Sequence, residues 1–330
     1  MSETAPEHRL EHHLAPRPHK VAVVGTGKVG STFAYALLLN GLVGQIVLID
    51  IDRRRAEGEA MDLNHAVPLS HSVRIWAGDY SDTAGADVVV VAAGVAQRPG
   101  ETRLDLVKRN AAIFADVIPR ITEYNQTGIL LVATNPVDVL SYVAWKVSGF
   151  PFGRVIGSGT VLDTARFRYL LADHLRVDPR NVHAHVIGEH GDSEVPVWSL
   201  ANVAGMPLGE YCRRHECTLG ADTRERIAQQ TRDAAYEIIQ RKGATHYAVA
   251  VGLLRIVESI LRDQHTVLSV SGLVPGYYGI KDTYISLPAV IGRAGVERVL
   301  HLDLSEVESD ALRQSAAVVR GVLDELDGIG

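Results

Sequence analysis

The segment GEHGD places His190 between Gly188 and Gly191. Histidine is the side chain best suited to exchange a proton near neutral pH, and flanking glycines let a ligand or another backbone come close. Earlier, in GSGTVLDTARFR, Asp163 and Arg166 are three residues apart on an expected helix and share one face. An aspartate there would orient an imidazole and stabilise its protonated form. An arginine there would bind a substrate carboxylate through two parallel hydrogen bonds.

Other interpretations of these residues remain open. An aspartate and an arginine at this spacing are also typical of a surface ion pair, which stabilises little. The chain has 14 histidines, and most of them have no catalytic role. His190 is a candidate for catalysis only because of the residues expected beside it. A metal site is a further alternative, because His183 and His185 share one face of an expected strand near His190. No carboxylate or cysteine ligand pattern accompanies them, so we expect no metal.

The segment GTGKVG supplies Gly25, Gly27 and Gly30 between an expected strand and an expected helix. In that setting the glycines permit a tight turn, approach of the backbone to a pyrophosphate and close helix–strand packing. The start of the helix then offers free N–H groups to the phosphates. Asp50, at the end of the next strand, would accept hydrogen bonds from an adenosine ribose and repel a 2′-phosphate. We therefore expect NAD; the arginines of DRRRAEG could instead hold the 2′-phosphate of NADP, or form a solvated helix start.

Continuous apolar runs recur through the first half of the chain: VAVV at 21–24, QIVLID, ADVVVVAAG, GILLVATNP and RVIGSG. Strands that are covered on both faces have this pattern. Helical patterns such as LVKRNAAIFADVIPRITEY lie between the runs. The alternation predicts an α/β fold with a doubly wound parallel sheet of the Rossmann type.

The character of the sequence changes after about residue 160. A helix from Val161 to about Asp173 leads into short, mixed strands in NVHAHVIGEHGDSEVPVWS, and helical stretches follow near 221–242 and 246–262. The segment YYGIKDTYISLPAVIG is strand-like with turns, and the chain closes on an amphipathic helix. We expect a flexible N-terminal tail at 1–19, an NAD-binding domain at 20–161 and an α+β substrate domain at 162–330. His8, His12 and His13 of the tail could form a metal site, but a solvated tail is the simpler interpretation.

The composition is that of an ordinary soluble protein, with 46% hydrophobic and 22% charged residues over a length of 330. The net charge of −6 makes a nucleic acid or an anionic membrane an unsuitable main partner. No apolar run is long enough for a membrane span, and the N-terminus lacks the apolar segment of a signal peptide. The two cysteines, Cys212 and Cys217, make no disulfide framework and fit no common zinc signature. We therefore expect a reduced, cytoplasmic protein with incidental thiols.

From residue 20 to its end the chain resembles the L-lactate/L-malate dehydrogenase family, and most closely its bacterial L-lactate dehydrogenases. The motifs that carry the resemblance are GTGKVG, DLNHA, RPGETRLDLVKRN, VATNPVDV, IGSGTVLDTARFR, IGEHGDSEVPVWS and KGATHYAVA. The resemblance implies an NAD-dependent oxidoreductase that interconverts pyruvate and L-lactate. It implies that His190 exchanges a proton with the substrate oxygen, that Asp163 pairs with it, and that Arg166 binds the carboxylate.

The resemblance assigns further residues to the same site. Arg103 would ride on a mobile loop and polarise the substrate carbonyl when the loop closes. Asn135 and Thr245 match residues that line the nicotinamide and substrate pocket, and Val249 matches an apolar wall against the nicotinamide. Developing charge on a carbonyl oxygen would be stabilised by Arg103 and by protonated His190, which agrees with these roles.

The choice of substrate depends on Gln97. Relatives that prefer malate have an arginine at the matching position, which can bind the second carboxylate of oxaloacetate. The uncharged Gln97 would leave that carboxylate unpaired, so we expect pyruvate. Arg98, one place later, keeps a malate dehydrogenase open as the alternative if the loop register shifts.

The resemblance also implies regulation and assembly. Many bacterial members are homotetramers that fructose 1,6-bisphosphate activates through an arginine and a histidine at a subunit interface. Arg168 and His183 match those positions, so we expect a homo-oligomer with this effector. Alternatively, Arg168 is a simple surface charge and His183 is a histidine packed in a strand. A related NAD- and metal-dependent glycosidase would need a cysteine–histidine metal pair, and Thr160 occupies the position before VLD. A dinucleotide sensor without catalytic activity would lack at least one of His190, Asp163, Arg166 and Arg103. This sequence has all four.

Overall fold

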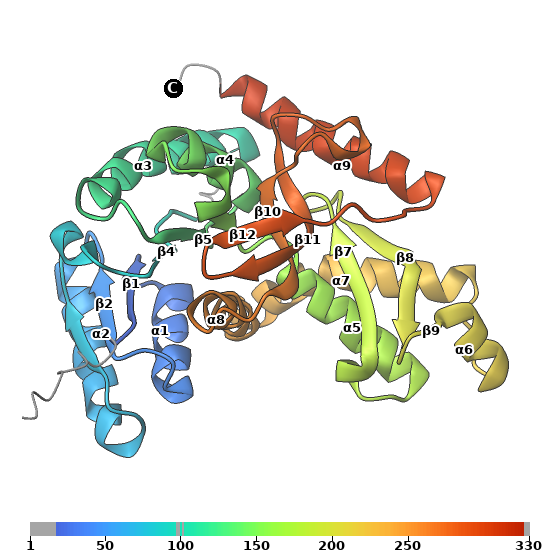
Figure 1. The fold of residues 1–330 in the computed structure, drawn as a ribbon, viewed down its shortest axis with the longest axis horizontal. Coiled ribbons are helices and arrows are strands. Elements are labelled where there is room, and N and C mark those ends of the chain that lie inside the picture. The colour runs from blue at the N-terminus through green and yellow to red at the C-terminus, as the bar shows by residue number, and fades with distance from the viewer. Residues whose placement is uncertain (1–17, 97–99, 101, 327–330) are drawn as a thin grey trace, which may run out of the picture.

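The computed structural model describes residues 18–96, 100 and 102–326, without the side chain of Arg103. A nine-stranded sheet forms its centre, in the order β12-β11-β10-β6-β5-β4-β1-β2-β3 (Figure 1). The six parallel strands are β1 (Lys20–Val24), β2 (Gln45–Ile49), β3 (Arg74–Ala77), β4 (Val88–Val91), β5 (Ile129–Val132) and β6 (Val155–Gly157). Their order, 3-2-1-4-5-6, is that of two mononucleotide-binding halves joined between β1 and β4.

Helices cover both faces of this sheet (Figure 1). Along β4, Val88 and Val90 belong to the apolar core on one face, while Val89 and Val91 belong to the core on the other. The first of these cores includes α1 (Lys28–Asn40), α2 (Arg53–Ala66) and α8 (Tyr247–Leu261), and the second includes α3 (Arg103–Tyr124), α4 (Val137–Ser148) and α9 (Glu306–Glu325). This two-sided burial explains the continuous apolar runs and confirms the predicted doubly wound fold.

A third core lies beside the sheet and carries much of the second half of the chain (Figure 1). Its elements are α5 (Val161–Leu175), the antiparallel strands β7 (Val182–Ile187) and β8 (Val195–Val203), and the helices α6 (Leu208–Arg214) and α7 (Ala221–Lys242). The short strand β9 (Met206–Pro207) pairs with β8. Short 3-10 helices connect elements at Val67–Leu69, Tyr80–Thr83, Phe152–Arg154, Pro179–Asn181 and Tyr277–Gly279. Among the helices of the described residues, none is long and apolar enough to cross a membrane.

Two features of the sheet differ from what the sequence patterns predict. The edge strand β3 was missed, because its first residue is exposed and its last two are only half-buried, so it forms no continuous apolar run. The antiparallel strands β10 (Thr266–Leu273), β11 (Tyr284–Gly292) and β12 (Gly295–Val299) extend the sheet from β6, although they follow residue 161 in the chain. Sequence periodicity does not specify which sheet a strand joins.

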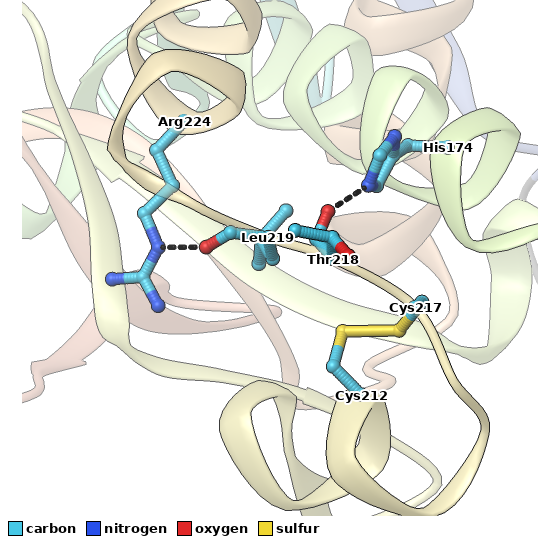
Figure 2. The surroundings of a disulfide bond; sticks show 6 residues. All are labelled: His174, Cys212, Cys217, Thr218, Leu219 and Arg224. Carbon is cyan, nitrogen blue, oxygen red and sulfur yellow. Dashed lines mark hydrogen bonds between the residues drawn. A yellow bond between two sulfur atoms is a disulfide. The ribbon is translucent and has the colours of Figure 1, made fainter.

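The expectation of free thiols was wrong, because Cys212 and Cys217 form a disulfide (Figure 2). Helix α6 ends at Arg214, and the chain turns back through Glu216, whose φ is 54°. The backbone N–H of Cys217 then donates to the carbonyl of Cys212 at 3.2 Å, and the two Cα atoms lie 4.5 Å apart. This local turn brings the two cysteine side chains within bonding distance, so a single disulfide forms without further cysteines.

Candidate active site

The three charged groups that the sequence suggested as partners form one cluster. His190 lies in the loop between β7 and β8, and its ring Nδ1 is 2.5 Å from Oδ2 of Asp163, in the first turn of α5. The other carboxylate oxygen accepts a hydrogen bond of 2.7 Å from Arg166, one turn further along the helix. Asp163 is 2% exposed and Arg166 13%, so the pair is not the solvated surface ion pair that the spacing alone would allow.

The cluster shifts the protonation of its members. Burial works against the charge of Asp163, but the opposite charges and hydrogen bonds of His190 and Arg166 outweigh it and hold its pKa below the usual value. Burial also works against the imidazolium of His190; the negative charge and hydrogen bond of Asp163 more than compensate and raise its pKa to about 9. The imidazole of His190 therefore stays protonated at neutral pH, which is the state in which an imidazole can donate a proton.

Glu194, a few residues past His190, was missed in the sequence. Its side chain is 6% exposed, and its Oε1 has no hydrogen-bond partner among the described residues. Burial and, after it, the nearby negative charge of Asp163 raise its pKa to about 8, although the positive charges of His190 and Arg166 oppose the shift. The signal in the sequence is an acidic residue directly before the apolar strand VPVW.

A cavity of about 150 Å³ opens at this cluster. Its wall includes five residues that the sequence analysis placed at the site, from four separate segments: Asn135, Arg166, His190, Thr245 and Val249. Val29, in the first turn of α1, lines the same cavity and connects it to the glycine turn. The side chains of Arg166 and His190 therefore face the same cavity that reaches the predicted dinucleotide site.

The glycine turn has the shape that a bound pyrophosphate requires. Gly25 has a φ of 96°, and a Cβ on Gly30 would lie 1.9 Å from the carbonyl oxygen of Gly25. Only glycine fits either position without a shift of the turn. At Gly27, the N-cap of α1, a Cβ would meet no atom within 4 Å, so the backbone there borders open space. This space at the helix N-terminus fits the phosphates of a dinucleotide.

Asp50 follows β2 and lies beside this turn. Its Oδ2 accepts hydrogen bonds from the backbone N–H and the hydroxyl of Thr26, at 2.7 and 3.0 Å, and its Oδ1 accepts from the N–H of Asp52 at 2.9 Å. The carboxylate is therefore fixed by the turn itself, with oxygen lone pairs left for a ribose. Of the three arginines that could favour NADP, Arg53 is paired with Glu57 on the exposed side of α2.

Several residues of the predicted site lie in the segment before α3. Gln97, Arg98 and Pro99 are outside the described residues, and so is the side chain of Arg103. Arg103 is the first residue of α3, which Thr102 caps through a reciprocal pair of hydrogen bonds with Asp105. The roles of Gln97 and Arg103 stay predictions.

Arg168 and His183 lie on two elements that pack together, and neither is among the residues that line the cavity. Arg168 is half-buried on α5, and His183 is exposed on the neighbouring strand β7. Burial and, after it, the electrostatic effects of Arg168 and His183 lower the pKa of His185 on β7 to about 4. Both predicted effector residues therefore act on the same neighbouring side chain, and their role as an effector site stays a prediction.

One metal alternative, at His8, His12 and His13, lies outside the described residues. His183, His185 and His190 do not converge as a group of three ligands among them, whereas the largely exposed Asp263, His265 and Glu297 do. Thr160, the residue before VLD, is buried, and its hydroxyl donates to the carbonyl of Val186 at 2.6 Å.

A dinucleotide-binding sheet whose glycine turn borders a cavity with a carboxylate-paired histidine defines an NAD-dependent oxidoreductase. Residues 19–157 match the family model of the lactate/malate dehydrogenase NAD binding domain, and residues 160–327 match that of the lactate/malate dehydrogenase alpha/beta C-terminal domain. The chain belongs to the lactate/malate dehydrogenase family.

Relatives with curated names agree with this membership. The chain is 52% identical to the L-lactate dehydrogenase of Thermoanaerobacter sp. (strain X514), over 94% of its length and 99% of the relative. It is 50% identical to the L-lactate dehydrogenase of Priestia megaterium, over 96% and 99%. Among solved structures, a lactate dehydrogenase from a Medee basin deep-sea metagenome library superposes with a TM-score of 0.91 at 48% identity, covering 93% of this chain and 98% of that one.

Proposed function

We propose that the protein is an L-lactate dehydrogenase that reduces pyruvate to L-lactate with NADH and catalyses the reverse reaction with NAD. The observation that carries the proposal is the His190–Asp163–Arg166 cluster at a cavity that borders the glycine turn. The names of relatives about 50% identical over nearly the whole chain support the same activity.

In this mechanism the chain positions the substrate and moves one proton. NAD, when bound, supplies or accepts the hydride. Arg166 binds the pyruvate carboxylate, and its own orientation is fixed by Asp163. Protonated His190 donates to the carbonyl oxygen as negative charge grows there, and Asp163 holds the ring in place. Arg103 adds a second donor when its loop closes; such a donor contributes about 3 kcal/mol in comparable sites.

The remaining residues of the site shape the pocket. Val249 forms an apolar wall for the nicotinamide, and Asn135 and Thr245 line the space between it and the substrate. Gln97 selects pyruvate, because it offers no charge to a second carboxylate. We also propose that residues 20–161 bind the cofactor and that residues 162–330 supply the proton-transfer groups.

Assembly and regulation complete the proposal. The protein acts in the cytoplasm as a homotetramer, and fructose 1,6-bisphosphate activates it through Arg168 and His183. The proposal is supported by the electrostatic effect of both Arg168 and His183 on the same neighbour, His185.

The experiment is NADH oxidation with pyruvate and, separately, with oxaloacetate, each with and without fructose 1,6-bisphosphate. We expect kcat/KM to favour pyruvate at least about a hundredfold, the discrimination expected when a desolvated carboxylate lacks a partner. Equal use of both, or preference for oxaloacetate, would mean that Arg98 enters the pocket and that the protein is a malate dehydrogenase. If the effector changes neither the KM for pyruvate nor the sedimentation profile, its part of the proposal fails.

A further inference from the structure

The disulfide between Cys212 and Cys217 lies at the edge of the third apolar core (Figure 2). Cys212, in the last turn of α6, is 8% exposed and belongs to that core, while Cys217 is half-buried and packs against it. The neighbours of Cys217 in the chain, Glu216 and Thr218, are exposed. Cys217 is therefore the half of the disulfide that a reagent in solvent reaches first.

Backbone hydrogen bonds also bring the two cysteines together. The N–H of His215 donates to the carbonyl of Tyr211 at 3.0 Å, and the N–H of Cys217 donates to the carbonyl of Cys212 at 3.2 Å. The cysteines are separated by 5 positions, and such short loops gain the least stability from a cross-link. The reduced cysteines are therefore expected to stay near each other, so that the bond can form again after it is broken.

The chemistry of this pair is that of a reversible site. In the cytoplasm, the compartment proposed above, thiols are kept reduced, and the disulfides that form are usually transient, catalytic or redox-sensing. Cys212 and Cys217 are the only cysteines of the chain, so no third thiol of the same chain can rearrange the pair. Thiol–disulfide exchange at this place is thus limited to the pair and an external partner.

The segment that follows the disulfide connects three helices. The carbonyl of Thr218 accepts a hydrogen bond of 2.8 Å from Nε2 of His174, at the end of α5 (Figure 2). The carbonyl of Leu219 accepts one of 3.2 Å from Nε of Arg224, near the start of α7. Because the disulfide anchors this segment to α6, it holds α5, α6 and the start of α7 together.

Two of these helices reach the cavity of the candidate active site. Helix α5 contributes Arg166 to its wall, and α7 contributes Ala235 and Ile239. The two helices also pack against each other. A change in how firmly the start of α7 is held would therefore reach the cavity through packed elements.

We propose that Cys212–Cys217 is a redox site that a dithiol reductant opens and that adjusts the cavity wall through α7. A thiolate of the reductant attacks the sulfur of Cys217, the S–S bond breaks, and Cys212 leaves as a thiolate that takes up a proton. The second thiol of the reductant attacks the resulting mixed disulfide, and Cys217 leaves in the same way. The reductant is oxidised to its own disulfide, and two electrons and two protons pass to the protein.

The geometry favours a reductant with two thiols. In a mixed disulfide with a monothiol, the nearby Cys212 attacks Cys217 and expels the monothiol before a second molecule arrives. The second thiol of a dithiol is equally local, so it competes with Cys212 and completes the reduction. The exchange reaction is independent of the proposed function, whereas the coupling to the cavity rests on it.

The first test counts free thiols in the wild-type protein after treatment of the folded chain. We expect none after exposure to air, both cysteines free after dithiothreitol, and far fewer free thiols after 2-mercaptoethanol at equal thiol concentration. Hydrogen exchange, followed by mass spectrometry, should be about tenfold faster in residues 215–224 of the reduced protein, because local opening becomes easier there. Helix α9, which belongs to another core, should show no change.

The second test compares the KM for pyruvate of the oxidised and the reduced protein. We expect reduction to raise the KM about threefold with little change in kcat, because α7 shapes the cavity and carries none of the proton-transfer groups. Cys217→Ser is the control: it replaces the half-buried cysteine and leaves Cys212 in the core. This variant should behave as the reduced wild type, both with and without dithiothreitol.

The outcomes separate this proposal from the proposed function. Two free thiols per chain after exposure to air, or equal reduction by the dithiol and the monothiol, would overturn the redox site. An unchanged KM, or a response of Cys217→Ser to dithiothreitol, would overturn the coupling through α7. If the protein does not reduce pyruvate at all, the proposed function fails, while the thiol counts and hydrogen exchange still decide whether the pair is a redox site.

Discussion

The glycine turn and the His190 loop border the same cavity, but they are built by opposite means. The turn is local: Gly25, Gly27 and Gly30 are within six residues, and backbone conformation alone gives the shape. The His190 loop is assembled from distant parts, since the ring of His190 contacts Asp163 on α5 and its backbone N–H donates to Asp138 on α4. Binding of a cofactor can be encoded in a short motif, whereas the charge of a proton donor is set by the whole fold.

The largest expected effect comes from the reactive group of the second region. Replacing His190 by Asn removes the proposed proton donor, and we expect kcat/KM for pyruvate to fall about 10²- to 10⁴-fold. NADH affinity, measured by fluorescence titration, should be unchanged, because the glycine turn is not altered. His174→Asn is the control: His174 lies at the end of α5 and bonds to Thr218, far along the helix from Asp163 (Figure 2).

A loss smaller than about tenfold in His190→Asn would contradict the assignment of the donor, since general acid catalysis contributes at least ten times that. A matching loss in His174→Asn would show that any histidine replacement on this part of the fold disturbs the site. Either result would contradict the assignment of proton transfer to the His190 loop and of cofactor binding to the glycine turn.

The next largest effects are expected in the glycine turn, where Gly30 and Gly27 have different surroundings. In Gly30→Ala the new Cβ would lie 1.9 Å from the oxygen of Gly25, so we expect a loss of about 1–3 kcal/mol in the free energy of unfolding. In Gly27→Ala the Cβ meets open space, so stability should stay within about 0.5 kcal/mol while NADH binds more weakly. Urea unfolding and NADH titration measure both.

The two glycine variants also test where the pyrophosphate binds and how rigid the turn is. Wild-type NADH affinity in Gly27→Ala would mean that the open space is not where the pyrophosphate lies. Wild-type stability in Gly30→Ala would mean that the turn moves easily, and that its shape is not fixed by close packing.

The same difference explains how much the sequence could predict. The strands buried on both faces, the glycine turn and Asp50 follow from local patterns, and so does the helical spacing of Asp163 and Arg166. Asp138 and Glu194 carried a weaker signal, an acidic residue beside an apolar run, and their partners lie far away in the chain. The disulfide was missed because it depends on the positive φ of Glu216, which cysteine spacing does not reveal.

The smallest effect expected is that of pH, and it tests the charges of the second region directly. Because the pKa of His190 is raised to about 9, the imidazolium that the proposed mechanism uses for pyruvate reduction persists at neutral pH. We expect kcat/KM for pyruvate to be constant below that value and to fall about tenfold per pH unit above it. Oxidation of L-lactate requires neutral His190, so its kcat/KM should rise with pH through the same midpoint.

Stability should follow the same groups with a definite sign. A pKa raised in the folded state means that His190 contributes fully below its unfolded pKa, near 6.5, and that this contribution is lost as pH rises through about 9. The lowered pKa of Asp163 has the reverse effect: its contribution is present above about pH 4 and is lost as pH falls. Melting temperatures of the wild type and of His190→Asn, measured from pH 6 to 10, should converge toward the alkaline end. A constant difference across that range would mean that His190 is not charged in the folded protein, and the proton would then have to come from another group.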